Sequence, residues 1–338
     1  MAAYKVKILR LAVFVRRHPY LFALIGFLSG VGSFLLVDRQ EGMASAVAAL
    51  VLASWVLLLL ERPIRLLVGR WLGMEVPAPV VHFSAQLVHQ ESFFFVLPFF
   101  LITTTWTSTQ ALFTLAIGAA AVVSIWDPVY HGRLTQRRWL YLAYHATAIF
   151  VTLLTALPII VHLSTPQTYA IATALTVVFA LPSLTHTFPA RGLAGIAGLV
   201  ALTLALGASA WFGRAIVPPA TFWLTDMAIT DDMDEDMRRA NGTKEVLCPG
   251  ELDGDRVYAF SGVRAPRGLN ESVHHEWSHN GRLQDRMDVE VFGGREEGYR
   301  IWTYKENFPD EPNGQWRVRV RTESGQLIGQ IDFHIDCD

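Results

Sequence analysis

Seven ionisable side chains lie near one end of the apolar segments in the first two-thirds of the sequence. Imidazole and carboxylate groups bind zinc and other divalent metals, and they also pass protons to one another. Because an ionisable group at membrane depth is costly, its presence favours a functional role. We therefore expect a metal site or a proton relay where these side chains converge. The candidates are His82, His89, Glu91, Asp127, His131 and His145, with His186 at the end of a later segment.

An interfacial position is the alternative for these residues. His, Tyr and Trp are common where membrane meets water, because the ring sits in hydrocarbon while its polar edge stays wet. Residues 1–217 contain no His-Glu-x-x-His or Asp-x-x-Asp signature of a metal site. Several aromatic residues in the same region support the interfacial alternative, namely Tyr130, Trp139, Tyr141 and Tyr144.

A second candidate site lies in a segment with strand-like alternation. His275, Trp277 and His279 are spaced two residues apart, so they share one face of a strand. Two imidazoles on one face are suited to binding a metal or another ligand. The alternative is that the tryptophan packs in a core and that the histidines pack beside it or face solvent. The sequence leaves both alternatives open.

The only two cysteines, Cys248 and Cys337, both lie in the hydrophilic last third of the chain. In an oxidising compartment they would close a loop of about 90 residues and stabilise the domain by several kcal/mol. In a reducing compartment they would be two free thiols. The topology of the preceding membrane segments decides between these alternatives.

Seven apolar stretches are long enough, or nearly long enough, to cross a membrane. A helix needs about 20 mostly apolar residues to span the hydrocarbon core, and each unpaired backbone amide there would cost several kcal/mol. The sequence therefore predicts a membrane all-α bundle of about seven transmembrane helices. The predicted spans are Tyr20–Val37, Met43–Leu60, Ser92–Thr105, Gln110–Trp126, Leu140–His162, Tyr169–Leu184 and Leu193–Val217.

Arginine and lysine are unevenly distributed over the connections between these spans. Positive residues are retained on the cytoplasmic side during insertion, so their positions set the orientation. Twelve precede the first span or follow the second, fourth and sixth, whereas only Arg39 and Arg214 lie in the alternate connections. In a bacterial inner membrane, this predicts a cytoplasmic N-terminus and, after seven spans, a periplasmic C-terminal domain. The twelve are Lys5, Lys7, Arg10, Arg16, Arg17, Arg62, Arg65, Arg70, Arg133, Arg137, Arg138 and Arg191.

The hydrophobic pattern changes after Thr221 from a helical period to a period of two residues. Trp316, Val318 and Val320 alternate with arginines, and Asn280-Gly281 is typical of a tight hairpin turn. Short strands with regular turns indicate an all-β antiparallel sandwich of immunoglobulin-like shape. We expect a transmembrane domain over residues 1–217, a linker and first strand region over 218–250, and a soluble periplasmic β-sandwich domain over 251–338.

The two parts of the chain carry opposite charge. Residues 1–217 have a net charge of +8 and residues 218–338 a net charge of −10, which together give the overall −2. The acidic part has no basic stripe that would neutralise phosphates, so we expect no nucleic-acid partner. The expected partners are the lipid bilayer and an envelope protein or glycan.

Two motifs in the last third resemble those of a bacterial domain family of unknown function. The first is the hairpin His275-Glu-Trp277-Ser-His279-Asn280-Gly281, and the second is the ending Gly314-Gln-Trp316-Arg-Val318-Arg-Val320 with Gly325, Ile328, Gly329, Phe333 and Ile335. The resemblance covers about 70 residues. It implies an uncharacterised inner-membrane protein with a multi-span N-terminal region and a periplasmic β-sandwich, and it implies no activity.

Three functions are compatible with this sequence. The first is a non-enzymatic envelope protein whose β-sandwich binds a protein or glycan. The second is a membrane-embedded enzyme that uses a divalent metal held by the His, Glu and Asp group. The third is a small-solute transporter, which the absence of an inverted repeat in the sequence disfavours.

Overall fold

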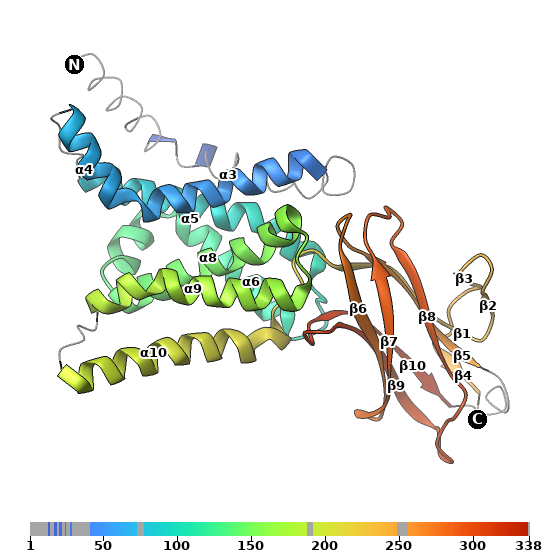
Figure 1. Ribbon diagram of the computed structural model, residues 1–338. Coiled ribbons are helices and arrows are strands. Elements are labelled where there is room, and N and C mark those ends of the chain that lie inside the picture. The colour runs from blue at the N-terminus through green and yellow to red at the C-terminus, as the bar shows by residue number, and fades with distance from the viewer. Residues whose placement is uncertain are drawn as a thin grey trace. The chain divides into compact units, whose positions relative to one another are not determined.

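The computed structural model describes residues 41–72, 78–187, 192–248 and 256–336, with a few single residues between 13 and 28. The chain divides into two compact units (Figure 1). The described elements of the first unit are helices, and the second unit contains every described strand. The first unit comprises Met1–Phe99, Leu115–Ile160 and Ala170–Trp211, and the second comprises Phe100–Thr114, Val161–Tyr169 and Phe212–Asp338.

The described helices follow the apolar stretches of the sequence. A helix pairs its backbone N–H and C=O groups internally, which makes it stable in an apolar environment. Pro98 and Pro158 lie inside helices that nevertheless continue past them. The helices are α3 (Glu41–Leu59), α4 (Glu61–Leu72), α5 (Ala78–Thr103), α6 (Gln110–Ile125), α7 (Asp127–Val129), the π-helix η1 (Tyr130–Leu134), α8 (Arg138–Val161), α9 (Thr165–Thr187), α10 (Gly192–Phe212) and the 3-10 helix η2 (Gly213–Ile216).

Three described helical segments are long and apolar enough to cross a membrane, namely Ser84–Thr103, Arg138–Val161 and Gly192–Ile216. A fourth exists if Gln110–Ile125 and Asp127–Leu134 are taken as one span, although they are bent by 94° relative to each other. The described part of the chain therefore does not show the seven spans that the sequence predicts. Within the described residues the chain has three or four candidates.

Two further predicted spans fall in helices α3 and α9. The apolar segments found there among the described residues, Ser45–Leu58 and Thr165–Leu181, are shorter than the candidate spans. The first predicted span, Tyr20–Val37, lies mostly outside the described residues. Hydropathy alone does not separate these cases.

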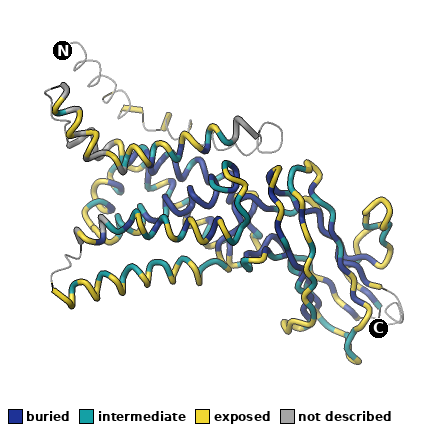
Figure 2. The backbone as a smooth tube through the Cα atoms, viewed as in Figure 1, coloured by how far each residue is buried: buried dark blue, intermediate teal, exposed yellow. Residues whose placement is uncertain are grey.

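The candidate spans differ in how much of each is covered by the protein. The most apolar parts of α5 and α8 are 61% and 67% buried, whereas that of α10 is 0% buried. Figure 2 shows this contrast as dark blue stretches along α5 and α8 and none along α10. An apolar helix with no buried residues is suited to contact with lipid along its whole length.

Two sheets form most of the second unit. One has the strand order β1-β5-β8 and the other has the order β4-β10-β9-β6-β7, while β2 and β3 form a separate small ribbon. The strands are β1 (Trp223–Thr230), β2 (Met233–Asp234), β3 (Arg239–Ala240), β4 (Val246–Leu247), β5 (Val257–Arg264), β6 (Asn270–His279), β7 (Arg282–Phe292), β8 (Tyr299–Lys305), β9 (Gly314–Thr322) and β10 (Leu327–Ile335). Four of them, β1 to β4, lie in the range that the sequence predicts as linker and first strand.

The hairpin predicted from Asn280-Gly281 is present, and a second hairpin joins β9 to β10. Asn280 and Gly281 have φ angles of 48° and 80°, as the tight turn between β6 and β7 requires, and β9 pairs with β10 in antiparallel register. One pair departs from the antiparallel prediction, because β4 runs parallel to β10 and places Leu247 beside Ile335. The β domain is therefore all-β, with predominantly antiparallel but mixed pairing, and its immunoglobulin-like shape stays a prediction.

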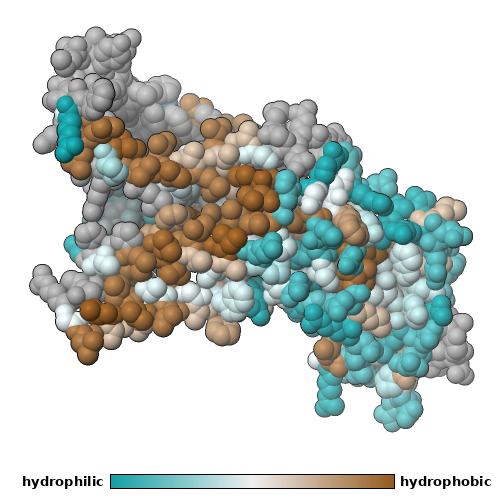
Figure 3. Space-filling model, in the orientation of Figure 1, coloured by the Kyte–Doolittle hydropathy of each residue, from teal (hydrophilic) through white to brown (hydrophobic). Residues whose placement is uncertain are grey.

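The cores of the β domain take residues from both sheets. One core combines Ile229 and Ala259 of the smaller sheet with Trp277, Trp316 and Phe333 of the larger one, and all are almost completely buried. This burial follows from the period of two, which sends alternate side chains to the inner face. On the face shown in Figure 3, the strands present mostly hydrophilic residues, whereas the helices present mostly hydrophobic ones.

The second unit also contains two connections between helices. Gln110 donates its side-chain N–H to the Leu327 carbonyl oxygen at 2.8 Å, and the backbone N–H of Thr165 donates to the Glu271 carboxylate at 2.7 Å. Gln326 donates its side-chain N–H to the Val217 carbonyl oxygen at 3.0 Å. The β domain is therefore hydrogen-bonded to the α5–α6 connection, to the α8–α9 connection and to the segment after α10.

Candidate functional site

A chain of hydrogen bonds joins three side chains inside the first unit. His89 of α5 lies with Nδ1 at 2.8 Å from the Tyr130 hydroxyl and with Nε2 at 2.9 Å from Nδ1 of His145 in α8. If the Tyr130 hydroxyl donates to His89, then His89 donates onward through Nε2 to His145. The structure thus brings together two members of the predicted set, His89 and His145, with Tyr130 as a third.

The environment of this chain is aromatic, and two of its three members are closed to solvent, whereas His145 is partly exposed. His89 and Tyr130 are 0% and 1% exposed. The Tyr141 ring is stacked on His145 at 6.1 Å between centroids, and the Tyr144 ring meets His89 edge-on at 5.2 Å. Rings that pack on every side fix the orientation of the imidazoles, so the hydrogen-bond chain is preorganised.

The position of Tyr130 depends on irregular helical structure. The helix direction changes by 94° between Ile125 and Asp127, next to Pro128, and the π-helix η1 begins at Tyr130. Single π-turns occur frequently at functional sites because they turn one side chain away from its regular position. Pro128 is the local signal that could have indicated this irregularity, whereas the sequence indicates for Tyr130 only an interfacial aromatic residue.

The other predicted members lie in separate hydrogen-bonded groups. The side-chain N–H of Gln86 donates to the Asp127 carboxylate at 2.8 Å, and the side-chain oxygen of Gln86 lies 2.8 Å from Nε2 of His131. Glu91 accepts a hydrogen bond from Ser54 at 3.0 Å. No group of three or more His, Cys, Asp or Glu side chains among the described residues is placed to hold a metal ion. The side chains of His82 and His186 lie outside the described part, so the complete predicted set is untested.

The second predicted site lies between the two sheets. His275 is 0% exposed, and its Nδ1 lies 2.8 Å from the Thr303 hydroxyl and its Nε2 3.2 Å from the Ser261 hydroxyl. Trp277 is also 0% exposed and donates its indole N–H to Thr303 at 3.2 Å. Burial lowers the pKa of His275 to about 3, so the ring is neutral. In the closed sandwich, these residues have no surface with which to contact a ligand.

His279 is the accessible member of the predicted binding group. Its ring is stacked on Trp316 with centroids 4.6 Å apart, and Nε2 lies 2.9 Å from the Asn313 carbonyl oxygen. Residues 275–279 also have the sequence His-Glu-x-x-His. That motif binds zinc when two histidines one helical turn apart converge. Here it lies on strand β6, with His275 in the core and His279 on Trp316, so the two rings have different partners.

Glu271 is a buried carboxylate that the sequence did not indicate. It is 4% exposed, and one oxygen accepts hydrogen bonds from the backbone N–H and the hydroxyl of Thr165 at the start of α9. The other oxygen has no hydrogen-bond partner among the described residues. Burial raises the pKa of Glu271 to about 7, and the charge of Glu323 adds to this effect. The carboxyl therefore changes charge near neutral pH.

Comparison with known proteins gives two family matches. The model of a family described as "Family of unknown function (DUF5924)" matches residues 1–259, and that of "Protein of unknown function (DUF2914)" matches residues 270–335. No curated protein matches the chain. Among solved structures, a β-glucosidase from Kluyveromyces marxianus is 15% identical over 35% of this chain and 14% of that chain, with a TM-score of 0.20. A likeness this weak supports no statement about fold or activity.

Proposed function

We propose that this chain, which belongs to the DUF5924 family of unknown function, is a bacterial inner-membrane protein that presents its β domain in the periplasm. There the domain binds an envelope protein or glycan. The observation that carries this proposal is the composition of the second unit, in which the β domain is hydrogen-bonded to two interhelical connections. These interhelical connections therefore belong to the same compact unit as the β domain.

The distribution of charge supports a periplasmic position. The connections in the second unit, residues 100–114 and 161–169, contain no Lys or Arg, whereas the basic segments around Arg65, Arg133 and Arg138 belong to the first unit. Connections that lack positive charge are the ones that cross the membrane during insertion. The acidic β domain is thus grouped with the connections that the orientation rule sends outside.

The two cysteines support the same compartment. The Asp336 N–H donates to the Leu247 carbonyl oxygen at 3.1 Å, so the ends of β4 and β10 lie side by side. Cys248 directly follows Leu247, and Cys337 directly follows Asp336. Cys337 itself lies outside the described residues, and its pairing with Cys248 is a proposal. A cystine at this position would fasten β4 to β10 and would persist in an oxidising periplasm.

Orientation and cystine can be tested together in cells. We expect a periplasm-dependent reporter fused after Asp338 to be active, and we expect both thiols to resist alkylation until a reductant is added. A matched protein with Cys248→Ser should show one thiol that reacts without reductant. A reporter active only in the cytosol, or two thiols that react freely in the unreduced protein, would refute the periplasmic proposal.

Proton transfer within the bundle is a second candidate function. It is favoured by one observation, the hydrogen-bonded chain from Tyr130 through His89 to His145. Each ring has a donor and an acceptor nitrogen in its neutral form, so a proton that enters at one end can be passed on while another leaves. Such buried polar groups in membrane helices are typical of proton pathways.

Removing the Tyr130 hydroxyl tests this candidate with little change in packing. We expect Tyr130→Phe to lower proton flux through purified protein in liposomes by about tenfold or more, because the first donor of the chain is lost. Tyr144→Phe is the matched control, since the Tyr144 hydroxyl donates to the Ala120 carbonyl oxygen and lies outside the chain. Equal flux in both variants and the parent protein would exclude a relay through Tyr130.

A further inference from the structure

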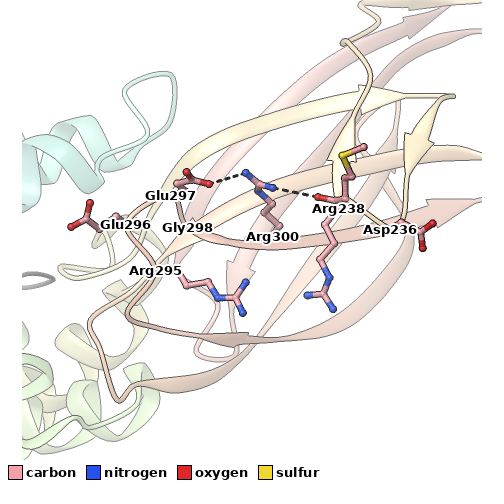
Figure 4. A pocket seen from close by; sticks show the side chains of 8 residues that line it. Asp236, Arg238, Arg295, Glu296, Glu297, Gly298 and Arg300 are labelled. Carbon is pink, nitrogen blue, oxygen red and sulfur yellow. Dashed lines mark hydrogen bonds and ion pairs between the residues drawn. The ribbon is translucent and has the colours of Figure 1, made fainter.

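A pocket of about 460 Å³ lies between two loops of the second unit. One loop joins β2 to β3 and carries Met237 and Arg238, and the other joins β7 to β8 and includes Arg295–Gly298 (Figure 4). Arg300 of β8 connects them, because its guanidinium donates to the Glu297 carboxylate at 2.9 Å and to the Met237 carbonyl oxygen at 3.4 Å. The pocket is therefore a built feature of both loops.

Two further guanidinium groups in the pocket are held by aromatic rings. The Arg238 guanidinium lies 5.7 Å from the centroid of the Trp302 ring, and that of Arg295 lies 5.0 Å from the centroid of the Tyr299 ring. In the part of the chain that the structure describes, neither arginine forms an ion pair. A guanidinium that stacks on a ring keeps its N–H donors available in its own plane, where they match the oxygens of an anion.

The acidic residues of the pocket leave these two arginines uncompensated. Glu297 is paired with Arg300. Figure 4 shows the Arg238 and Arg295 guanidinium groups below Arg300 in the view, while Glu296 and Asp236 lie at opposite edges and point away from them. The lining has three carboxylates and three guanidinium groups, and among the described residues the ion pair within it is that of Arg300 with Glu297.

The backbone of the two loops is fixed in uncommon conformations. Arg238 has a φ of 52°, which residues with a side chain rarely adopt. Gly298 has a φ of 83°, and a Cβ atom there would lie 2.6 Å from the Thr225 hydroxyl oxygen. These uncommon backbone conformations hold the arginines on defined turns. An arginine that only extends into solvent does not need such a conformation.

We propose that Arg238, Arg295 and Arg300, which we call the arginine pocket, bind an oxyanion, namely a phosphoryl or carboxylate group of an envelope molecule. Arginine forks recognise such groups with two parallel hydrogen bonds, and the volume suits a small ligand or the head of a larger one. This inference rests on the proposed binding function and names the chemistry of its ligand. The arginine pocket brings three guanidinium groups together in a part of the chain, residues 218–338, whose net charge is −10.

The test is a calorimetric titration of the full-length protein in nanodiscs with inorganic phosphate and, in a separate experiment, with succinate. We expect the double variant Arg238→Ala, Arg295→Ala to bind the preferred anion about tenfold more weakly or worse, because charged hydrogen bonds are lost. Arg295→Lys should bind with intermediate affinity, since an ammonium keeps the charge without the fork. Binding to vesicles that contain phosphatidylglycerol, but to neither free anion, would assign the group to a lipid head.

Arg286→Ala is the matched control, because Arg286 lies on β7 of the same domain, is half exposed and does not line the pocket. The inference fails if the parent protein binds none of the three probes, or if the double variant binds them as tightly as the parent. Either result would leave the orientation and cystine measurements unchanged. Failure of the arginine pocket is thus distinguishable from failure of the periplasmic proposal.

Discussion

Replacing Trp277 by alanine is expected to lower the free energy of unfolding of the β domain by about 3–5 kcal/mol, the range for removing a buried aromatic side chain. Trp277 is 0% exposed and meets the Phe333 ring edge-on with centroids 6.2 Å apart. Its indole N–H also donates to Thr303, which contacts His275 in turn. Alanine would leave both a cavity between the sheets and a polar group with fewer partners.

The measurement is chemical denaturation of the full-length protein in detergent, in which unfolding is monitored by the circular dichroism signal of the strands. Trp106→Ala is the matched control, because Trp106 belongs to the second unit but is 51% exposed. Its replacement should cost less than about 1 kcal/mol. Equal midpoints for the two variants would show that Trp277 does not hold the sheets together, and Thr303→Val would then separate packing from hydrogen bonding.

Replacing Glu271 by glutamine is expected to remove a pH dependence of stability near neutrality. The folded state raises the pKa of Glu271 from 4.5 to about 7, so it binds a proton that the unfolded chain releases. This stabilising proton is fully present below pH 4.5 and is lost as the pH rises through 7. The difference corresponds to roughly 3 kcal/mol. Glutamine mimics the protonated acid, and its carbonyl oxygen still accepts from Thr165.

We therefore expect Glu271→Gln to match the parent protein at pH 5 and to be more stable by up to roughly 3 kcal/mol at pH 8. Unfolding midpoints measured at both pH values check this. Glu323→Gln should reduce the pH dependence in part, since the Glu323 charge contributes to the raised pKa of Glu271. Glu290→Gln, an exposed control on β7, should leave it unchanged. A glutamine variant that is less stable than the parent at pH 8 would contradict the assignment.

This pH dependence acts on the hydrogen bonds that the Glu271 carboxyl accepts from Thr165, the first residue of α9. At high pH the ionised carboxylate is a better acceptor for Thr165 but is costly to bury, so the contact between strand β6 and the α8–α9 connection depends on pH. Among the described residues the second oxygen of Glu271 has no hydrogen-bond partner, and Glu271 comes from a strand rather than from the start of the helix, so it differs from an ordinary helix cap.

The sequence by itself determined the elements that depend on local pattern. Alternation of apolar and polar residues predicted β9, and Asn280-Gly281 predicted the β6–β7 turn, because a period of two and a positive φ are properties of neighbouring residues. Apolar stretches likewise predicted the helical region. The described residues contain three or four candidate spans rather than the predicted seven, and hydropathy does not show whether lipid or protein surrounds an apolar helix.

The tertiary structure decided which side chains meet. His89, Tyr130 and His145 converge only because α5, η1 and α8 pack together, while Asp127 and His131 turn to Gln86 instead. The Glu271 contact and the arginine pocket each join segments distant in sequence, and no local pattern encodes such a contact. Local rules fix what a segment can form, whereas a site depends on distances between segments that only the packed chain defines.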